Sequence, residues 1–342
     1  VAQRQVDIHL PLRYGYCMEC LSQVLMDAHP RFGLVRHLFC LKATASGDAL
    51  LYNMEAIRIM LPNLLMLAHY EPRYCYLPDP DDGTTPFPYY IITHEGVLLL
   101  TGDLQNAVLI REEAACDLFR RSVEGICRRF TPVMREMAGD VAGYLSIHQK
   151  LVDSLLHPAA PVTVAAEPCI LPCVPPEALA RYLPPEMLQD EKTAAMIRRF
   201  SENAGVHGYT SFFTMEGVEQ LLETGRIMEM QGPQIPRLRR EDVVTALREL
   251  LRRARSGLVK LYIFRQDLFQ DGVHFSMGLY ESKLFTGCEV ASRNAVFSDI
   301  SEATLCRVLR DYTECAQTLG DVYSPEESIQ LLSQRLARLP EK

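Results

Sequence analysis

The sequence lacks the features of several large classes of protein. None of its apolar runs reaches the roughly 18 to 20 uncharged residues that cross a bilayer, and its N-terminus carries no export signal. Of its 342 residues, 48% are apolar and 23% are charged, which is the balance of a globular protein long enough for two domains. This composition excludes disordered and fibrous proteins. We expect a cytoplasmic protein with no membrane partner.

Positive charge is also in short supply. The chain has 35 lysines and arginines against 43 aspartates and glutamates, which gives a formal net charge of -8. Proteins that contact the phosphates of a nucleic acid need a broad positive field. We therefore expect that the chain does not bind DNA by itself.

The familiar catalytic motifs are missing as well. The sequence contains no Gly-x-Gly, no Gly-x-Ser-x-Gly and no His-Glu-x-x-His, so it has neither a phosphate-binding glycine loop nor the motif of a common hydrolase or metalloprotease. Its nine histidines are scattered, and none stands at metal-ligand spacing from another. We predict a protein that is not an enzyme, with no catalytic residues, no cofactor and no metal.

Eleven cysteines are spread through apolar segments. An odd number without paired spacing is typical of free thiols in a reducing compartment. The pair Cys17-x-x-Cys20 lies at helical spacing with neighbouring apolar residues, which favours core packing over a redox or zinc site.

Proline marks the best candidate boundary between domains. Eight prolines fall between His157 and Met187, and each removes a backbone donor and disfavours helix just before itself. We divide the chain into a first α/β half at 1–157, a proline-rich connector at 158–187 and a second α/β half at 188–342. The first half carries a predicted insertion at about 44–86, near an aromatic-rich stretch whose tyrosines either fill a core or line a pocket.

The two halves repeat the same order of predicted elements. Each has a helix followed by a strand that begins Gly-Leu-Val, at Gly33 and at Gly257, and then a hairpin ending in Thr-Gly, an Asn-Ala-Val triplet and a long helix. The Thr-Gly pairs are 185 residues apart and the triplets 188 apart. The long helices are expected at about 112–130 and 302–319, each opened by glutamates that can cap it. We predict an α/β fold of two related halves, each a small sheet flanked by helices; chance recurrence is the alternative.

The hairpin of the first half, Tyr90-Ile-Ile-Thr-His-Glu-Gly-Val-Leu-Leu-Leu-Thr-Gly with the helix after it, resembles the half-domain of the phospholipase D-like superfamily. In that family two such halves pack around a shared cleft. The resemblance covers about 45 residues per half. The family's catalytic signature, His-x-Lys-x4-Asp, is replaced in both halves, by Phe87, Tyr89 and His94 in one and by Gly272, His274 and Leu279 in the other. The resemblance therefore implies a duplicated fold that has lost phosphodiester hydrolysis.

Three other segments resemble the regions that follow the helix-turn-helix domain in transcriptional regulators of gut bacteria. They are Glu167-Pro-Cys-Ile-Leu-Pro, the stretch from Phe213 to Arg226, and the stretch from Tyr323 to Leu332. Such regions sense an effector or dimerise. The chain begins with Val1, and we expect a DNA-binding domain to have stood before it.

The leading hypothesis is a sensor that binds a small-molecule effector in the cleft between two related halves, and contacts DNA only through a domain absent from this chain. The candidate ligand-binding residues are polar side chains near equivalent strand ends: Tyr89, Thr101, Asn106, His274, Thr286, Arg293 and Asn294. The two asparagines have a second interpretation, as side chains that hydrogen-bond the backbone of their own turns.

Two alternatives stay open. The chain could be a degenerate phosphodiesterase that uses His274. It could instead be a scaffold that forms a homodimer through a helix at 134–156 or at 324–339, because apolar residues recur there at helical spacing.

Overall fold

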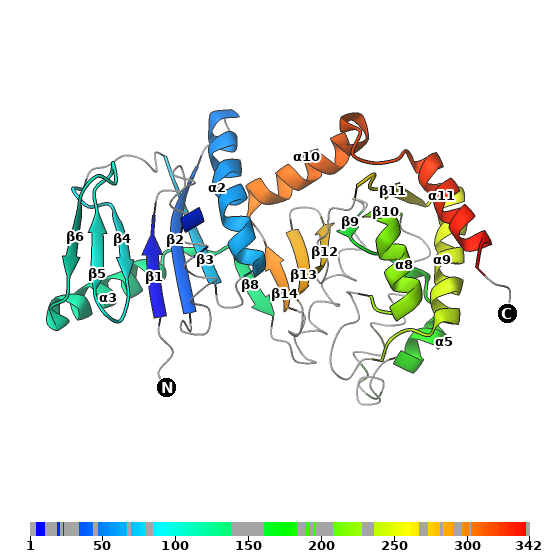
Figure 1. The fold of residues 1–342 in the computed structure, drawn as a ribbon, viewed down its shortest axis with the longest axis horizontal. Helices are drawn as coiled ribbons and strands as arrows, with labels where there is room; N and C mark the ends of the chain where they lie inside the picture. The colour runs from blue at the N-terminus through cyan, green and yellow to red at the C-terminus, as the bar shows by residue number, and fades with distance from the viewer. Residues whose placement is uncertain are drawn as a thin grey trace. The chain divides into compact units, whose positions relative to one another are not determined.

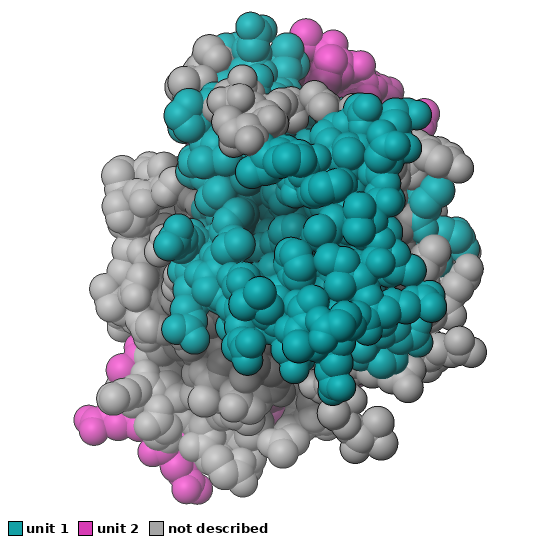
Figure 2. Space-filling model, turned by 90° about the vertical axis from the view of Figure 1, so that its left-hand side faces the viewer, with its two compact units in different colours: residues 1–135 teal, residues 136–342 magenta. Residues whose placement is uncertain are grey.

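The computed structural model of the chain describes the following residues: 5–10, 19–20, 23, 34–43, 47–66, 70–78, 85–137, 161–182, 189, 191, 195, 208–227, 236–266, 273–280, 283–290, 296–300 and 302–339. The chain divides into two compact units, Val1–Arg135 and Glu136–Lys342. Figure 2 shows one face of the first unit, whose described residues form a continuous surface. Among the described helices, none is both long enough and apolar enough to span a membrane.

The first unit is built on a mixed seven-stranded sheet (Figure 1). Its strands are β1 (Gln5–His9), β2 (Leu34–Lys42), β3 (Tyr70–Leu77), β4 (Tyr89–Ile92), β5 (Val97–Leu100), β6 (Ala107–Ile110) and β7 (Thr131–Pro132). Their spatial order is β6-β5-β4-β1-β2-β3-β7. The first three strands are parallel, whereas β4, β5 and β6 form an antiparallel meander on the other side of β1.

Two helices pack on this sheet. Helix α2 (Gly47–Met66) connects β2 to β3 and contacts both, with Ala49, Asn53, Ala56 and Met60 buried at helical spacing. Helix α3 (Glu113–Cys127) places Cys116, Val123 and Cys127 against Leu38, Ile92 and Val97 of the sheet. Leu38 and Phe39 are both buried and, as neighbours in a strand, point to opposite faces, so both faces of the sheet carry core.

The second unit contains another mixed seven-stranded sheet. Its strands are β9 (Val162–Ala165), β10 (Tyr209–Phe213), β11 (Val259–Ile263), β12 (Val273–Tyr280), β13 (Lys283–Val290) and β14 (Val296–Ile300), together with β8 (Met134–Met137), which crosses the boundary between the units. The order is β11-β10-β9-β12-β13-β14-β8. The strands β9, β10 and β11 are parallel, and β12, β13 and β14 are antiparallel.

Helices cover both faces of the second sheet. The larger core joins Phe213, Leu261 and Ile263 to the helices α8 (Met215–Thr224), α9 (Arg240–Arg255) and α11 (Pro325–Ala337), as well as to the short helices η2 (Leu171–Cys173), α5 (Pro176–Leu179) and η3 (Ala180–Tyr182). The other core joins Phe212 and Phe264 to Ala316 of α10 (Ala303–Leu319). Phe212 and Phe213 are neighbours in β10 and point to opposite faces of the sheet, so each packs against a different layer of helices.

The two sheets follow the same plan. Apart from the edge strands β7 and β8, each sheet has its first strand (β1 or β9) in a central place, the next two strands parallel on one side of it, and an antiparallel meander on the other, followed by a long helix. The start of that helix matches in detail. Glu112 and Glu302 cap α3 and α10 through their side chains, and the thiols of Cys116 and Cys306 each point to the carbonyl of the last strand residue before the helix. These positions are 190 residues apart in both pairs.

The boundaries differ from those expected. The units divide between Arg135 and Glu136, and the proline-rich segment 158–187 lies inside the second unit, where it supplies β9 and three short helices. The segment 44–86 is no insertion, because α2 and β3 are the regular crossover and third strand of the first sheet. Pro172 lies in the 3-10 helix η2 and Pro176 begins α5, positions that tolerate a missing backbone donor, so these prolines did not mark the boundary.

The predicted pairing of elements between halves needs correcting. The strand after Gly33 is β2, the second of its sheet, whereas the strand after Gly257 is β11, the third. Thr101 follows the end of β5, but Thr286 lies in the middle of β13. Both long helices are confirmed, as is α11 at 325–337. The predicted helix at 134–156 begins instead as the strand β8, and its remainder falls outside the described residues.

Candidate binding groove

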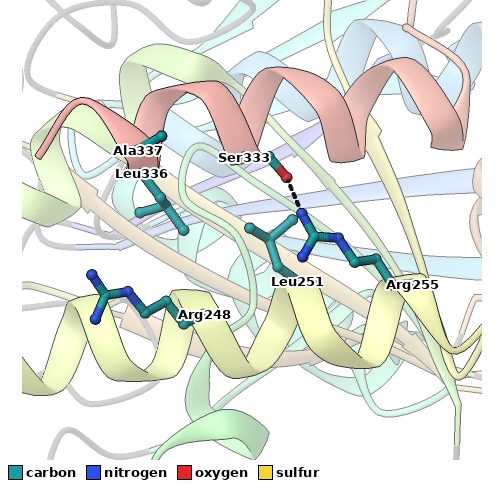
Figure 3. Close-up of a pocket in the computed structure, with 6 residues that line it drawn as sticks. All are labelled: Arg248, Leu251, Arg255, Ser333, Leu336 and Ala337. Carbon is teal, nitrogen blue, oxygen red and sulfur yellow. Dashed lines mark hydrogen bonds between the residues drawn. The ribbon is translucent and has the colours of Figure 1, made fainter.

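A groove lies between α9 and α11 in the second unit. It encloses about 250 Å³ and is lined by Arg248, Leu251, Arg255, Ser333, Leu336 and Ala337. Figure 3 shows the leucines and the alanine between the two arginines, with the Arg255 guanidinium reaching across to α11. Its Nη2 donates to Ser333 Oγ at 2.8 Å. The groove therefore combines an apolar floor with a cation on each side along α9.

The position of each arginine follows from the helical pattern of α9. Val243, Leu247, Leu250 and Ala254 are buried against the sheet, which leaves Arg248 and Arg255 exposed on the side toward α11. The two arginines are seven positions apart in the helix, so their Cα atoms are about 10 Å apart along its axis at the usual helical rise. One ligand a few carbon atoms long could contact both.

Carboxylates distinguish the groove arginines from their neighbours. Arg252 donates two hydrogen bonds of 2.7 Å to Glu249, and Arg253 donates a third of the same length. These bonds, opposed by partial burial, lower the pKa of Glu249 to about 2. Neither Arg248 nor Arg255 pairs with a carboxylate among the described residues. The groove thus keeps two cations whose charge is not neutralised by any acid in the described part of the chain.

Helix α11 is held in place by its own sequence. Ser324 and Glu327 form a reciprocal capping box at its N-terminus, with Pro325 in the first turn. Leu332 and Leu336 are buried in the core under α9, and Arg335 is paired with Glu219 of α8. The apolar stripe of this helix, one of the two expected dimer seams, therefore packs within its own unit.

The predicted ligand residues of the first unit have structural roles in its antiparallel strands and turn. Tyr89 is buried in β4, and its ring centroid lies 5.8 Å from that of His9. The Thr101 hydroxyl donates to Asp103 at 2.5 Å and accepts from the Asn106 amide at 3.1 Å, while the carbonyl of Asn106 accepts from the Thr101 amide. These bonds close the turn between β5 and β6, which gives Thr101 and Asn106 a structural role.

The structure describes only two of the four predicted residues of the second unit, His274 and Thr286. His274 lies opposite Glu289 and Thr286 opposite Met277 in the antiparallel pair of β12 and β13. The antiparallel register separates His274 and Thr286 by several pairs. Arg293 and Asn294 lie outside the described residues. None of the five predicted residues that the structure describes lines the groove.

The sequence pattern did not single out Arg248 or Arg255 as binding residues. The local signal was weak because four arginines share one helix end and only the Glu249 pairing separates them. The opposite wall, Ser333 to Ala337, comes from a helix about eighty residues further along the chain. No spacing rule connects the two.

Other polar clusters are already satisfied. Asp7 and Arg36, both buried, pair at 2.6 Å, and Arg36 reaches Glu124 of α3 at 2.7 Å. Burial opposes the charge of Arg36, but these carboxylates raise its pKa overall. Asp242 at the start of α9 accepts from Arg181 and Tyr182. Within the described part of the chain, no three histidine, cysteine or acidic side chains converge as metal ligands would.

Comparison with known proteins adds no constraint. No protein-family model matches the chain, and the search of curated proteins returned no match. The chemistry of the groove is therefore argued from its own residues.

Proposed function

We propose that the chain is the effector-sensing region of a bacterial transcriptional regulator, and that an organic anion with a short apolar portion binds in the α9–α11 groove. The observation that carries the binding proposal is the pair Arg248 and Arg255, which flank an apolar floor without a carboxylate partner among the described residues. The regulator context is supported by the three sequence segments that resemble such regions. One of them, 323–332, runs into the helix that forms one wall of the groove.

The class of ligand follows from the lining. An arginine guanidinium donates paired hydrogen bonds that match a carboxylate or a phosphate. Leu251, Leu336 and Ala337 offer apolar contact but no further polar group, so a highly polar ligand would lose its water without compensation. A monocarboxylate with an aliphatic chain fits both requirements. The net charge of -8 would repel such an anion elsewhere on the chain.

We further propose that the two units arose by duplication of one α/β half. The common strand order supports this, as do the glutamate caps and cysteine thiols 190 residues apart. The groove has no counterpart in this shared plan, because α11 follows the last common element. Ligand binding would then be an addition to the second unit only.

The test is titration of the full chain with octanoate by isothermal calorimetry, with neutral octanamide as the matched probe. We expect octanoate to bind and octanamide to bind at least about tenfold more weakly, since a hydrogen bond to a charged group contributes about 1.5–3 kcal/mol. The substitution Arg248→Ala should weaken the binding of octanoate by a similar factor, and Arg248→Glu should abolish it.

Arg240→Ala is the control, because Arg240 is an exposed arginine of the same helix that does not line the groove. Equal affinity of the wild-type chain, Arg240→Ala and Arg248→Glu for octanoate would refute the groove as the site. The regulator context is tested separately by sequencing the native reading frame upstream of the Val1 codon. An in-frame helix-turn-helix supports it, and a start codon directly upstream contradicts it.

A further inference from the structure

Two cysteines face each other across neighbouring strands of the first sheet. Cys40 of β2 and Cys75 of β3 are direct partners in the parallel register, and their Sγ atoms are 3.6 Å apart. Adjacent strands lie about 4.8 Å apart, within the range of Cα separations that a disulfide can bridge. Rotation about the two side-chain bonds is enough to bring the sulfurs together.

Both thiols are accessible. Cys40 and Cys75 are partly exposed, whereas Cys116, Cys127 and Cys306 are buried beneath helices. Cys20 and Cys315 are exposed, but no other described cysteine lies within hydrogen-bonding distance of either. The pair at 40 and 75 therefore combines access with a neighbouring sulfur.

The hydrogen bond between the two sulfurs shifts the pKa values of the two thiols in opposite directions. A thiol that donates to a neighbouring thiolate stabilises the charge, so the bond lowers the pKa of Cys75 and, together with burial, raises that of Cys40. Cys75 is therefore the more acidic of the two thiols, and thiolates are the nucleophiles of cysteine chemistry.

We propose that Cys40 and Cys75 form an oxidation site that peroxide converts reversibly into a disulfide joining β2 to β3. The Cys75 thiolate attacks one oxygen of hydrogen peroxide; an S–O bond forms, the O–O bond breaks, and the leaving hydroxide takes up a proton as water. The Cys40 sulfur then attacks the sulfenic acid, so that the S–S bond forms while the S–O bond breaks, and the thiol proton leaves with the hydroxide as a second water.

The oxidation thus removes two electrons from the pair and reduces one peroxide to two waters. A dithiol reductant returns the two electrons by thiol–disulfide exchange and restores both thiols. This site lies in the first unit and uses none of the groove residues, so it stands or falls independently of the binding proposal.

The experiment treats the full, reduced chain with hydrogen peroxide, blocks the remaining thiols with N-ethylmaleimide and maps tryptic peptides by mass spectrometry. Peptide 37–42 should appear joined to peptide 74–111 with two hydrogen atoms lost, and dithiothreitol should separate them. We expect at least about tenfold more of this product than of any other cysteine pair, because two thiols held side by side react at high effective concentration.

The substitutions Cys40→Ala and Cys75→Ala should each abolish the linked product, and Cys40→Ala should leave a sulfenic acid at Cys75 that dimedone traps. Cys116→Ala is the matched control and should keep the link, since Cys116 is buried on α3. The measurement on the wild-type chain requires no variant to fold. Recovery of Cys40 and Cys75 as separate maleimide adducts after peroxide treatment, or joined to other cysteines at random, would overturn the proposal.

Discussion

His37 is a buried histidine whose environment allows only its neutral form. It lies on β2 with no exposed surface, and its Nδ1 is 2.5 Å from the hydroxyl of Tyr70, which is itself buried on β3. Its Nε2 has no hydrogen-bond partner among the residues that the structure describes. Burial, with a smaller contribution from the charge of His9, lowers the pKa of His37 to about 3. The folded protein therefore holds this imidazole neutral at any pH well above 3.

This histidine makes the stability of the first unit depend on pH. Between about pH 6.5 and pH 3 the unfolded chain binds a proton at His37 and the folded chain does not. The contribution of neutral His37 to the free energy of unfolding is therefore fully present above pH 6.5 and decreases as the pH falls. Because of His37, we expect the free energy of unfolding to decrease by about 1 kcal/mol between pH 6.5 and pH 5.5, and by about 1.4 kcal/mol per pH unit further below. Urea denaturation followed by tyrosine fluorescence at pH 6.5 and pH 5.5 measures the slope.

The double variant His37→Leu/Tyr70→Phe removes the titrating ring and its partner together and should lack that part of the slope. His94→Gln is the control, because His94 lies in the exposed turn between β4 and β5. If the double variant has the wild-type slope, His37 is not the group that titrates.

At the level of elements, the turn from β10 into α8 depends on a very close backbone contact. Thr214 caps α8 by accepting a hydrogen bond from the Gly217 amide at 2.9 Å, and its own amide donates to the carbonyl of Ala166. A Cβ on Gly217 would lie 1.9 Å from that carbonyl oxygen. Helix α8 can approach the end of β9 only because residue 217 has no side chain.

Gly217→Ala should consequently destabilise the chain by at least about 2 kcal/mol, since backbone must move to admit the methyl group. Gly125→Ala makes the same chemical change in α3, where a Cβ would meet nothing within 4 Å. There we expect a gain of about 0.5–1 kcal/mol from the higher helix propensity of alanine. Thermal denaturation of both variants measures the contrast, and equal melting temperatures would contradict the model of the β10–α8 turn.

Periodicity in the sequence predicted the helices well and the sheets poorly. Apolar residues at helical spacing, with glutamates at the start, located α3 and α10 to within a few residues. The strand segments were recognisable too, but which strand pairs with which is decided by contacts distant in the chain. Gly33 and Gly257 precede similar amino-acid sequences, yet the strands that follow them occupy different places in their sheets.

For the whole molecule, the shared plan of the two sheets predicts that equivalent caps have equivalent effects. Glu112 accepts from the amides of Ala114 and Ala115, and Glu302 accepts from that of Leu305. We expect Glu112→Ala and Glu302→Ala each to cost about 0.5–2 kcal/mol of stability, with Glu302 at the upper end because it is buried.

Chemical denaturation of the two single variants and of Glu113→Ala provides the comparison. Glu113 is the exposed residue next to the cap, and no hydrogen bond of its side chain supports the helix start. A loss at only one of the two caps would show that the matching positions do not share a role.

The sequence by itself determined the α/β class, the positions of the long helices and the absence of familiar catalytic motifs, because these depend on local composition and spacing. Tertiary structure decided the rest. The proline-rich segment lies in the second unit because its strand β9 pairs with β10 and β12, and the packing of α11 beside α9 forms the groove at Arg248 and Arg255. Strand register set Cys40 against Cys75, thirty-five residues later. Such contacts join residues far apart in the chain, and no local pattern encodes them.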